Sequence, residues 1–561
     1  HEFPAPTIPY REITSTAHRL DAALSTNGSG YIILLGSPGS GKSTLLTRSL
    51  RYRSERVIHY YAYVPDSPQP NARRGESINF LHDLVLALSQ AGVHAGGTLA
   101  RPDLELLSEQ LGHQLAELGR EFRATGRRTI IVVDGLDHIH REHAPSRPLL
   151  ADLPEPGSLP AGVTFVLGSQ TDQLPSLPST LASQLSDAGR RVKMEHLARD
   201  EVVSLVSAAE LEPPPNAEQI ERVFALSDGH PLALAYIINR LRASPQPVDE
   251  VLEEVEPFEE RIDDQYFAHW REISRDPALV RLLAKVSRLR GAFDLDWVGT
   301  WADADALYSL HSRFAHYFSR ERDGRWRFFH NSFRVFLRRQ TASIPGVSSS
   351  AGDSSLFVEL AAHCRESESD RVERWDELYY LVGAGDHKSA IGAADRSELR
   401  RQFMSGRPPE SIASDLLGAL PSAAETDDSV ALARLTLLAS EFQQRDANLE
   451  DVPMSRQLLA LGRTRAAIDY ARHGNILRIP ATEAFDLCGA LFALAEPLDI
   501  LGGHVEIKRH ELDTADVLLA DWAKTAVRFR PLTQVLEAID RVKVEGEAQL
   551  GQTSEEASLE L

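Results

Sequence analysis

A short apolar run that leads directly into a glycine-rich loop constrains the fold of this chain more than any other feature. The run is Tyr31–Leu35, which has the continuous apolar character of a buried parallel strand. It continues into Gly36–Thr44 (GSPGSGKST) and then into a helical stretch from Leu45 to Leu50. Glycines let consecutive backbone N–H groups turn inward around phosphate oxygens, and a helix start adds the positive end of its dipole. The pattern G-x-x-x-x-G-K-S between strand and helix therefore predicts a phosphate-binding loop, and its flanking elements disfavour a chance glycine turn.

Eight loop residues are expected to bind the nucleotide, because they offer backbone amides, hydroxyls or an ammonium group to the phosphates. They are Gly36, Ser37, Gly39, Ser40, Gly41, Lys42, Ser43 and Thr44. Only seven of the 60 basic residues are lysines, and Lys42 is the only lysine before Lys193. A chain that otherwise uses arginine has kept the compact ammonium here. We expect Lys42 to reach the β- and γ-phosphates and to be exposed when the loop is empty. The Ser43 hydroxyl is predicted to ligate Mg²⁺.

A second buried strand ends in two acidic residues. The partner strand is Thr129–Val133, and Asp134-Gly135-Leu136-Asp137-His138 follows it. A carboxylate at the carboxyl end of a parallel strand beside a phosphate loop can hold Mg²⁺ through water, which we predict for Asp134. Asp137 is predicted to polarise the attacking water, with a helix or turn cap as the alternative. These two residues are the candidate catalytic pair.

Two further segments fit the same sheet. Arg56–Val64 follows the first helix, and Val163–Leu167 precedes Gly168-Ser169-Gln170. Alternating strands and helices predict a doubly wound α/β P-loop domain. The segment Gly168–Asp172 loosely imitates a guanine-reading loop, but position 137 holds aspartate where a GTPase would have glycine. An adenine nucleotide is therefore favoured over GTP.

Composition and charge exclude several classes of protein. A length of 561 residues suggests three to five domains, and 42% apolar with 25% charged residues excludes wholesale disorder. The net charge of −21 disfavours nucleic acid and anionic membranes as partners. Two cysteines, Cys364 and Cys488, cannot build a disulfide framework or a zinc site. The apolar run Leu487–Ala495 is too short to span a membrane, so we predict a soluble, cytoplasmic protein.

Three motifs resemble the NACHT-like group of the STAND signal-transduction NTPases. Asp134-Gly135-Leu136-Asp137 is similar to the D-G-L-D-E signature of that group. Ser227–Leu234 (SDGHPLAL) looks like its G-x-P helix start, and Arg325–Phe333 (RWRFFHNSF) looks like the end of its winged-helix domain. The resemblance covers residues from about Phe3 to Arg339.

The resemblance implies roles for three more residues. Pro231 would pack near the adenine, and His330 would touch the β-phosphate of ADP and keep the protein closed. Arg11, in Tyr10-Arg11-Glu12, is similar to a segment that borders the nucleotide base. For His330 the alternative is a satisfied core histidine among aromatic residues. The implied ligands are ADP or ATP with Mg²⁺.

Two positions depart from the pattern of the family. His138 replaces the final glutamate of D-G-L-D-E, and Gln170 replaces the sensor arginine that is expected after the fourth strand. Gln170 still belongs to the predicted nucleotide site, but a neutral amide cannot stabilise charge on a transferred phosphate as a guanidinium would. We therefore expect binding and switching, with at most slow ATP hydrolysis.

The order of the motifs predicts the domain organisation. The expected segments are an N-terminal segment bordering the nucleotide site (1–30), a P-loop domain (31–195), a helical domain with the G-x-P motif (196–257), a winged-helix domain (258–342), a linker (343–355) and a helical repeat or sensor domain (356–550). The predicted fold class is an α/β P-loop NTPase domain followed by an all-α domain, a winged helix and α-helical, tetratricopeptide-like repeats.

Local patterns support the winged helix. The expected elements are helices at Ala278–Leu289 and Asp305–Phe314, hairpin arms at Tyr317-Phe318 and Arg325–Phe329 around Asp323-Gly324, and a helix at Asn331–Arg338. DNA binding through the arginines of the wing is an alternative, which the interleaved Glu321 and Asp323 disfavour.

The segment from Leu356 to Val544 is predicted to be helical throughout. Two helix–turn–helix units are expected, Trp375–Leu381 followed by Ala384–His387, and Leu458–Arg463 followed by Tyr470–Arg472. Stacked helices of this kind form concave binding surfaces, although a plain helical bundle without a ligand is the alternative.

The resemblance to the STAND family implies an ADP- and ATP-dependent switch. It would be closed with ADP and would self-associate when a ligand, expected to be a protein, binds the C-terminal helical domain. A bacterial immune or signalling role follows only by analogy with the family. The alternatives are a turnover P-loop ATPase or GTPase and a STAND-type transcription regulator.

Overall fold

A computed structural model describes residues 10–50, 53–64, 73–93, 103–139, 145–244, 246–321, 324–342, 349–367, 371–449, 454–473 and 476–477. The chain divides into two compact units. Unit 1 comprises His1–Asp66 and Ala72–Ala342, and unit 2 comprises Ser67–Asn71 and Ser343–Leu561. Residues 1–9 of the expected N-terminal segment and 478–550 of the expected sensor domain lie outside the described residues.

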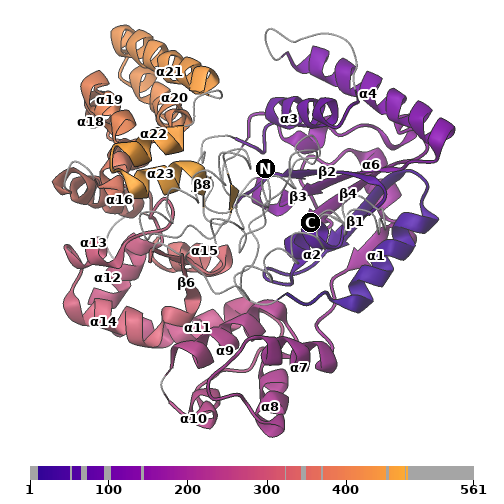
Figure 1. Ribbon diagram of the computed structural model, residues 1–561, viewed down its shortest axis with the longest axis horizontal. Coiled ribbons are helices and arrows are strands. Elements are labelled where there is room, and N and C mark those ends of the chain that lie inside the picture. The colour runs from indigo at the N-terminus through magenta and orange to yellow at the C-terminus, as the bar shows by residue number, and fades with distance from the viewer. Residues whose placement is uncertain are drawn as a thin grey trace. The chain divides into compact units, whose positions relative to one another are not determined.

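Unit 1 begins with a parallel sheet of five strands (Figure 1): β1 (Gly30–Leu35), β2 (Arg56–Tyr61), β3 (Thr129–Asp134), β4 (Val163–Ser169) and β5 (Arg191–Lys193). The order across the sheet is β2-β3-β4-β1-β5. The predicted α/β P-loop fold is confirmed, but β3 does not pair with β1, because β4 lies between them. The strand predicted to reach Val64 ends at Tyr61, since its neighbour β3 ends at the paired residue Asp134.

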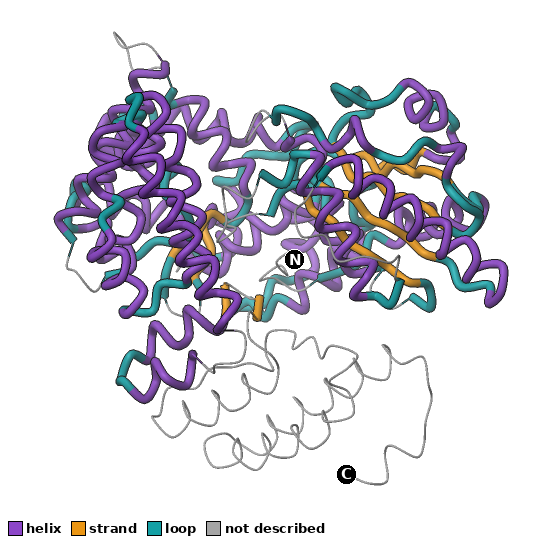
Figure 2. Tube along the Cα trace, turned by 90° about the horizontal axis from the view of Figure 1, so that it is seen from above, coloured by secondary structure: helices purple, strands orange, loops and turns teal. Residues whose placement is uncertain are grey.

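Helices cover both faces of this sheet (Figure 2): α1 (Thr14–Thr26), α2 (Lys42–Arg48), α3 (Ser77–Gln90), α4 (Leu104–Thr125) and α6 (Ser179–Leu185). Alternate residues of β1 point to opposite faces, as the period of a strand requires. Ile32 and Leu34 pack with α1 and α2 in one buried cluster, whereas Tyr31 and Ile33 pack with α3 and α4 in another. Short 3₁₀ turns complete the domain at Leu136–His138, Leu149–Asp152, Pro156–Ser158 and Ala188–Arg190.

The long helix α4 shows why the sequence folds in this way. Asp103 caps its first turn by accepting hydrogen bonds from the amides of Glu105 and Leu106. Four leucines at helical spacing, Leu107, Leu111, Leu115 and Leu118, are buried against the sheet. Gly126 then ends the helix in the left-handed conformation, with φ of 75°.

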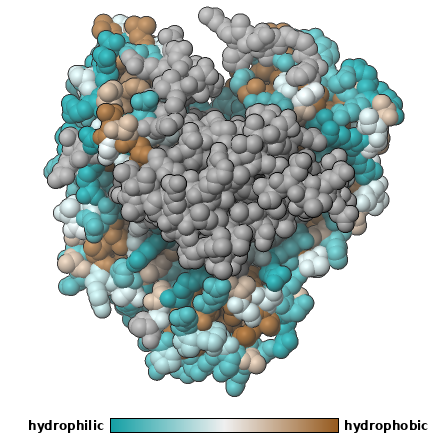
Figure 3. Space-filling model, in the orientation of Figure 1, coloured by the Kyte–Doolittle hydropathy of each residue, from teal (hydrophilic) through white to brown (hydrophobic). Residues whose placement is uncertain are grey.

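A group of four helices follows the sheet: α7 (Arg199–Ala208), α8 (Ala217–Ser227), α9 (Pro231–Ala243) and α10 (Val248–Glu253). Asn216 and Gln219 form a reciprocal capping box at the start of α8. Helix α9 is buried along most of its length, and the surface that Figure 3 shows over this group is mostly hydrophilic. The all-α domain after the P-loop domain is therefore present.

The last part of unit 1 has the predicted winged-helix elements: α11 (Ile262–Ile273), α12 (Pro277–Val286), α13 (Leu295–Gly299), α14 (Ala304–Arg313), a 3₁₀ turn (Ala315–Tyr317), β6 (Phe318–Arg320), β7 (Trp326–Phe328) and α15 (Asn331–Gln340). Strands β6 and β7 pair antiparallel, as the hairpin prediction requires, while Asp323 lies outside the described residues. Arg325 and Arg327 each lie 3.7 Å from a carboxylate oxygen of Glu321. These arginines of the wing thus have an acidic neighbour within the wing, which disfavours DNA binding.

Unit 2 is built from helices: α16 (Ser349–Glu366), a 3₁₀ turn (Val372–Asp376), α17 (Glu377–Ala384), α18 (His387–Ala393), α19 (Arg396–Met404), α20 (Pro409–Glu425), α21 (Ser429–Leu449), α22 (Met454–Ala460) and α23 (Thr464–Ala471). Helices α16 and α17, α20 and α21, and α22 and α23 pack as sequential pairs. Both predicted helix–turn–helix units are present, as α17–α18 and α22–α23.

Two predictions about this region are wrong. The expected linker 343–355 contains the start of α16, which begins at Ser349. Farther along this helix, Leu356 and Leu360 are buried. The Ser354 hydroxyl donates a hydrogen bond to the Ala384 carbonyl at 2.6 Å. The expectation of helix alone is also wrong, because β8 (Arg472–His473) and β9 (Ile476–Leu477) pair antiparallel. Strands of two residues are too short to leave an alternating pattern in the sequence.

None of the helices in the described part of the chain combines the length and the apolar character that crossing a membrane would require.

Candidate nucleotide-binding site

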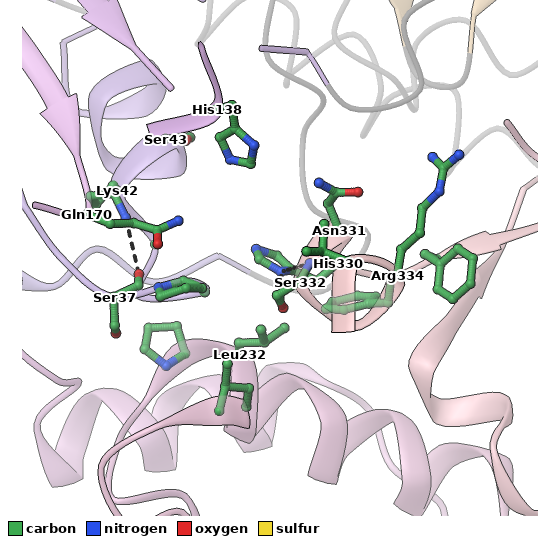
Figure 4. Close-up of a pocket in the computed structure, with 18 of the residues that line it drawn as sticks. Ser37, Lys42, Ser43, His138, Gln170, Leu232, His330, Asn331, Ser332 and Arg334 are labelled. Carbon is green, nitrogen blue, oxygen red and sulfur yellow. Dashed lines mark hydrogen bonds between the residues drawn. The ribbon is translucent and has the colours of Figure 1, made fainter. Parts of the chain in front are cut away.

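Unit 1 contains a cavity of about 520 Å³ between the phosphate loop and the winged helix. One wall is formed by the loop before α2 and by the ends of β3 and β4. The opposite wall is formed by the start of α9, the start of α11, the end of β7 and α15. Figure 4 shows the close-up, in which His330 points from α15 toward the phosphate loop.

The phosphate loop has the backbone that its glycines were expected to allow. Gly39 and Gly41 adopt φ of 77° and 89°, the left-handed region that favours glycine. A side chain at Gly39 would also collide with α9, because its Cβ would lie 2.4 Å from Leu232 Cδ2. Helix α2 begins at Lys42, three residues before the predicted start at Leu45, since the loop winds directly into the helix.

Lys42 is buried, so the expectation that it is exposed in an empty loop is wrong. Only 8% of the residue is accessible. Its Nζ donates to the carbonyls of Gly36 and Ser37, at 2.6 and 3.1 Å. Burial lowers the pKa of Lys42, while the carboxylates of Asp137 and Asp134 act in the opposite direction. The ammonium group therefore stays inside the loop, next to the place where phosphate would bind.

The residues of this site fit a nucleotide phosphate with Mg²⁺. Ser40 is 3% exposed, and its hydroxyl has no hydrogen-bond partner among the described residues, which leaves a polar atom inside the loop. Ser43 and Asp134 both line the cavity, as the predicted Mg²⁺ site requires. Asp134 has room because residue 168 is glycine, where a Cβ would lie 2.0 Å from the Asp134 Oδ1. In Mg²⁺–nucleotide sites of this kind the protein usually supplies one hydroxyl and one carboxylate, and phosphate oxygens and water supply the other ligands.

Asp137 is held by the two residues at which the sequence departs from the family pattern. Gln170 Nε2 donates to Asp137 Oδ2 at 2.6 Å, and His138 Nε2 lies 3.4 Å from the same oxygen. The His138 ring stacks on Tyr63, with centroids 4.3 Å apart. Gly135, not Asp137, is the N-cap of the 3₁₀ turn Leu136–His138. The Asp137 carboxylate is thus oriented by Gln170 and His138 in the cavity wall. Its side chain does not cap the 3₁₀ turn, which was the alternative role.

The start of α9 contacts the phosphate loop through His230. This residue is fully buried, and its Nε2 lies 3.4 Å from Ser37 Oγ. The His230 ring stacks on Phe258, with centroids 4.3 Å apart. Burial, with smaller effects of His196, His330 and Lys42, lowers the pKa of His230 to about 3. The G-x-P segment therefore brings a neutral histidine against the loop, beside the predicted Pro231.

His330 lies at the start of α15 and faces the same cavity. Its Nδ1 accepts a hydrogen bond from the Ser332 amide at 3.2 Å, so His330 is the N-cap of α15. Burial, assisted by the charges of Lys42 and His138, lowers the pKa of His330 to about 4. The imidazole is consequently neutral near pH 7.

Most of the predicted site residues meet in this one cavity: Ser37, Gly39, Gly41, Lys42, Ser43, Thr44, Asp134, Asp137, Gln170, Pro231 and His330 line it. Gly36 and Ser40 belong to the loop but do not line the cavity. Arg11 is exposed and does not line it either. Asp172, from the guanine-like segment, is paired with Arg191 and does not reach the cavity.

Several lining residues were not predicted from the sequence. Arginines stand out among them: Arg261, Arg327, Arg334 and Arg339. Arg334 donates through Nε to the Ser287 carbonyl at 2.9 Å, which ties α15 to the segment after α12. The only signal in the sequence was the helical spacing of Arg334 after His330, which places both near one face of α15.

Comparisons with known proteins agree with this geometry for one part of the chain. A family model described as an AAA domain matches residues 25–175. This stretch is a P-loop domain of the AAA type. No curated protein matches the chain in sequence.

Similar solved structures were found at low identity. A STAND protein with a tetratricopeptide repeat sensor from Pyrococcus horikoshii has 13% identity over 98% of this chain and 79% of that chain, with a TM-score of 0.37. A Walker-type ATPase of Pyrococcus abyssi has 17% identity over 60% and 98%, with a TM-score of 0.32. Cdc6p from Pyrobaculum aerophilum has 12% identity over 60% and 97%, with a TM-score of 0.29.

Proposed function

We propose that this chain is a nucleotide-dependent molecular switch of the STAND, NACHT-like type, which rests closed with ADP and opens with ATP. The observation that carries the proposal is the shared cavity, in which the phosphate loop and the start of α15 face each other. Lys42 and Ser43 on one wall would bind the phosphates and Mg²⁺, and His330 on the other would bind the β-phosphate. Bound Mg²⁺ would neutralise phosphate charge.

A ligand that touches both walls stabilises the arrangement in which they are together. Its differential affinity for the closed and open forms sets how far it shifts the equilibrium. Each hydrogen bond to a charged phosphate contributes about 1.5–3 kcal/mol, so one contact from the winged helix can decide between forms that differ by a few kcal/mol. This is the physical basis for a switch that depends on which nucleotide is bound.

Slow hydrolysis is part of the proposal. Gln170 presents a neutral amide and uses it to hold Asp137, at 2.6 Å. A positive group aimed at developing charge is usually a large contribution to catalysis of phosphoryl transfer. A turnover ATPase or GTPase is the competing function, and it predicts rapid multiple turnover with no retained product.

Unit 2 is proposed as the sensor of a protein ligand, because paired helices form extended binding surfaces. Binding there would favour the ATP form and self-association of the opened protein. A cytoplasmic role in bacterial defence or signalling rests on the resemblance to the family alone.

The test begins with the nucleotide that copurifies with the full chain and with its turnover rate. The switch predicts retained ADP, turnover far slower than once per second, and a monomer that self-associates when ATP replaces ADP. Lys42→Ala is the matched control, which should carry no nucleotide and should not respond to ATP. Rapid turnover without retained ADP would establish the competing function instead.

A further inference from the structure

A chain of hydroxyl groups runs through the interior of unit 1 and ends on His330. Tyr236 OH lies 2.9 Å from Tyr266 OH, and Tyr266 OH lies 2.7 Å from Ser332 Oγ. Ser332 Oγ lies 2.7 Å from His330 Nδ1. The two tyrosines are buried, with 5% and 0% of their surfaces exposed. The chain thus joins α9, α11 and α15.

One contact fixes the direction of the whole chain. The Ser332 amide can only donate, and it donates to His330 Nδ1 at 3.2 Å, so this nitrogen carries no proton. The Ser332 hydroxyl must therefore donate to Nδ1 as well. Its oxygen then accepts from Tyr266, whose oxygen in turn accepts from Tyr236. Burial raises the pKa of both tyrosines, which keeps both phenols protonated as donors.

We propose that Tyr236, Tyr266 and Ser332 are positioning residues that hold His330 as the tautomer with its proton on Nε2. With Nδ1 occupied, the ring presents an Nε2–H donor on its other side, and Figure 4 shows the ring directed from α15 toward the phosphate loop. The inference rests on the proposed contact between His330 and a nucleotide phosphate.

The tautomer decides whether the contact attracts or repels. Because the ring is neutral near pH 7, the proton can occupy only one nitrogen. With the proton on Nδ1, a lone pair on Nε2 would face the phosphate oxygens and neither side could donate. A chain of hydroxyls that all point one way also polarises each successive bond, which makes the terminal donor stronger.

The chain also makes this donor depend on the packing of three helices. Tyr236 belongs to α9, whose first turn contacts the phosphate loop, and Ser332 belongs to α15. If α15 moves away from α9 and α11, the bond between Tyr266 and Ser332 is lost, while the Ser332 amide and hydroxyl stay beside Nδ1. The Ser332 hydroxyl then no longer accepts a hydrogen bond from a phenol, so it holds the ring less firmly in this tautomer and polarises it less. The phosphate donor would then be strongest in the closed arrangement.

A double-mutant cycle in the 561-residue protein, with labelled ADP as the ligand, tests the proposal. Ser332→Ala in the wild-type background is expected to speed ADP release by about 3- to 10-fold, the effect of one hydrogen bond. In a His330→Gln background it is expected to have no effect, because the glutamine amide reaches the Nε2 position as a donor whatever its neighbours do. Equal acceleration in both backgrounds would mean that Ser332 is merely structural and would overturn the proposal.

Tyr266→Phe extends the cycle, since it removes one hydroxyl and keeps the ring. It should act in the same direction as Ser332→Ala and also lose its effect in the His330→Gln background. Tyr31→Phe is the matched control, because Tyr31 is buried and donates to the Pro154 carbonyl, outside this chain of hydroxyls. A control variant that speeds release as much as Tyr266→Phe would count against the proposal.

Nitrogen NMR of ¹⁵N-histidine-labelled protein separates this inference from the proposed function. The His330 signals are identified by their loss in His330→Gln. Ser332→Ala leaves only the longer 3.2 Å amide contact on Nδ1, so a measurable share of Nδ1–H is expected in that variant. A proton on Nε2 in the wild type, with this share of Nδ1–H in Ser332→Ala, supports the positioning role even if ADP release never changes, in which case the phosphate contact is what fails. A wild-type ring protonated on Nδ1 overturns the inference directly.

Discussion

Replacing His330 by asparagine should release ADP without weakening the fold. The two ring nitrogens of His330 have different roles, because Nδ1 caps α15 and Nε2 faces the cavity. Asparagine is a good N-cap, so its oxygen can replace Nδ1 as the acceptor for the Ser332 amide, but the side chain is too short to replace Nε2. Alanine removes both functions, which makes the pair of variants informative.

The magnitude follows from the lost contact. A neutral imidazole that donates to a charged phosphate contributes about 1.5–3 kcal/mol, which corresponds to roughly 10- to 150-fold in the ADP release rate. Loss of the N-cap costs about 0.5–2 kcal/mol of folding free energy and applies to His330→Ala alone. We therefore expect fast release in both variants and a lowered melting temperature only in His330→Ala.

Stopped-flow chase of fluorescent ADP gives the release rate, and sedimentation velocity gives the association state. The His330→Asn variant should self-associate without any trigger when ATP is present. If ADP leaves His330→Asn at the wild-type rate and the protein stays monomeric, the histidine has no role in holding the closed state.

Three further predictions concern the opposite wall of the cavity. Lys42→Ala should weaken ADP binding at least about 10-fold by calorimetry, because a charged donor to the phosphates is removed; unchanged affinity would contradict the assignment. Gln170→Arg should raise ATP hydrolysis, measured as phosphate release, and an unchanged or lower rate would mean that the missing arginine does not limit turnover. Gly168→Ala should displace Asp134 and abolish the Mg²⁺ dependence of ATP binding, whereas Gly157→Ala, where a Cβ meets nothing within 4 Å, should not.

The phosphate loop and the two acidic positions could be predicted because their signals are local. Glycine spacing, a flanking strand and a following helix identify the residues from Gly36 to Thr44 without knowledge of any long-range contact. Asp134 required only one more inference, that carboxyl ends of parallel strands meet at one edge of a sheet. The three-residue strand β5 carried too little pattern to be foreseen.

Contacts between distant segments could not be predicted in the same way. Nothing in the sequence indicates that Gln170 would donate to Asp137, or that β4 would lie between β1 and β3. Tyr236 and Tyr266 occupy ordinary helical positions, and only packing of their helices joins the hydroxyls. Arg11, carried over from a match of three residues, does not line the cavity, which shows how little so short a match constrains.

Acid should destabilise unit 1 through histidines whose pKa values are lowered in the folded protein. Burial lowers the pKa of His330 and His269 to about 4 and that of His230 to about 3, whereas the unfolded chain protonates histidine near its ordinary value of 6.5. Between these values the unfolded state binds more protons than the folded state, so the free energy of unfolding falls as the pH drops from about 6.5 toward 4.

At pH 5 each of these three histidines is expected to cost about 2 kcal/mol of stability relative to neutral pH. Denaturant unfolding at pH 7 and pH 5 measures the difference. His269→Asn should reduce it by about that amount, while His18→Asn, at an exposed position of α1, is the control for the substitution itself. A free energy of unfolding that is independent of pH over this range would show that the histidines do not stay neutral in the folded protein, and the tautomer argument for His330 would lose its premise.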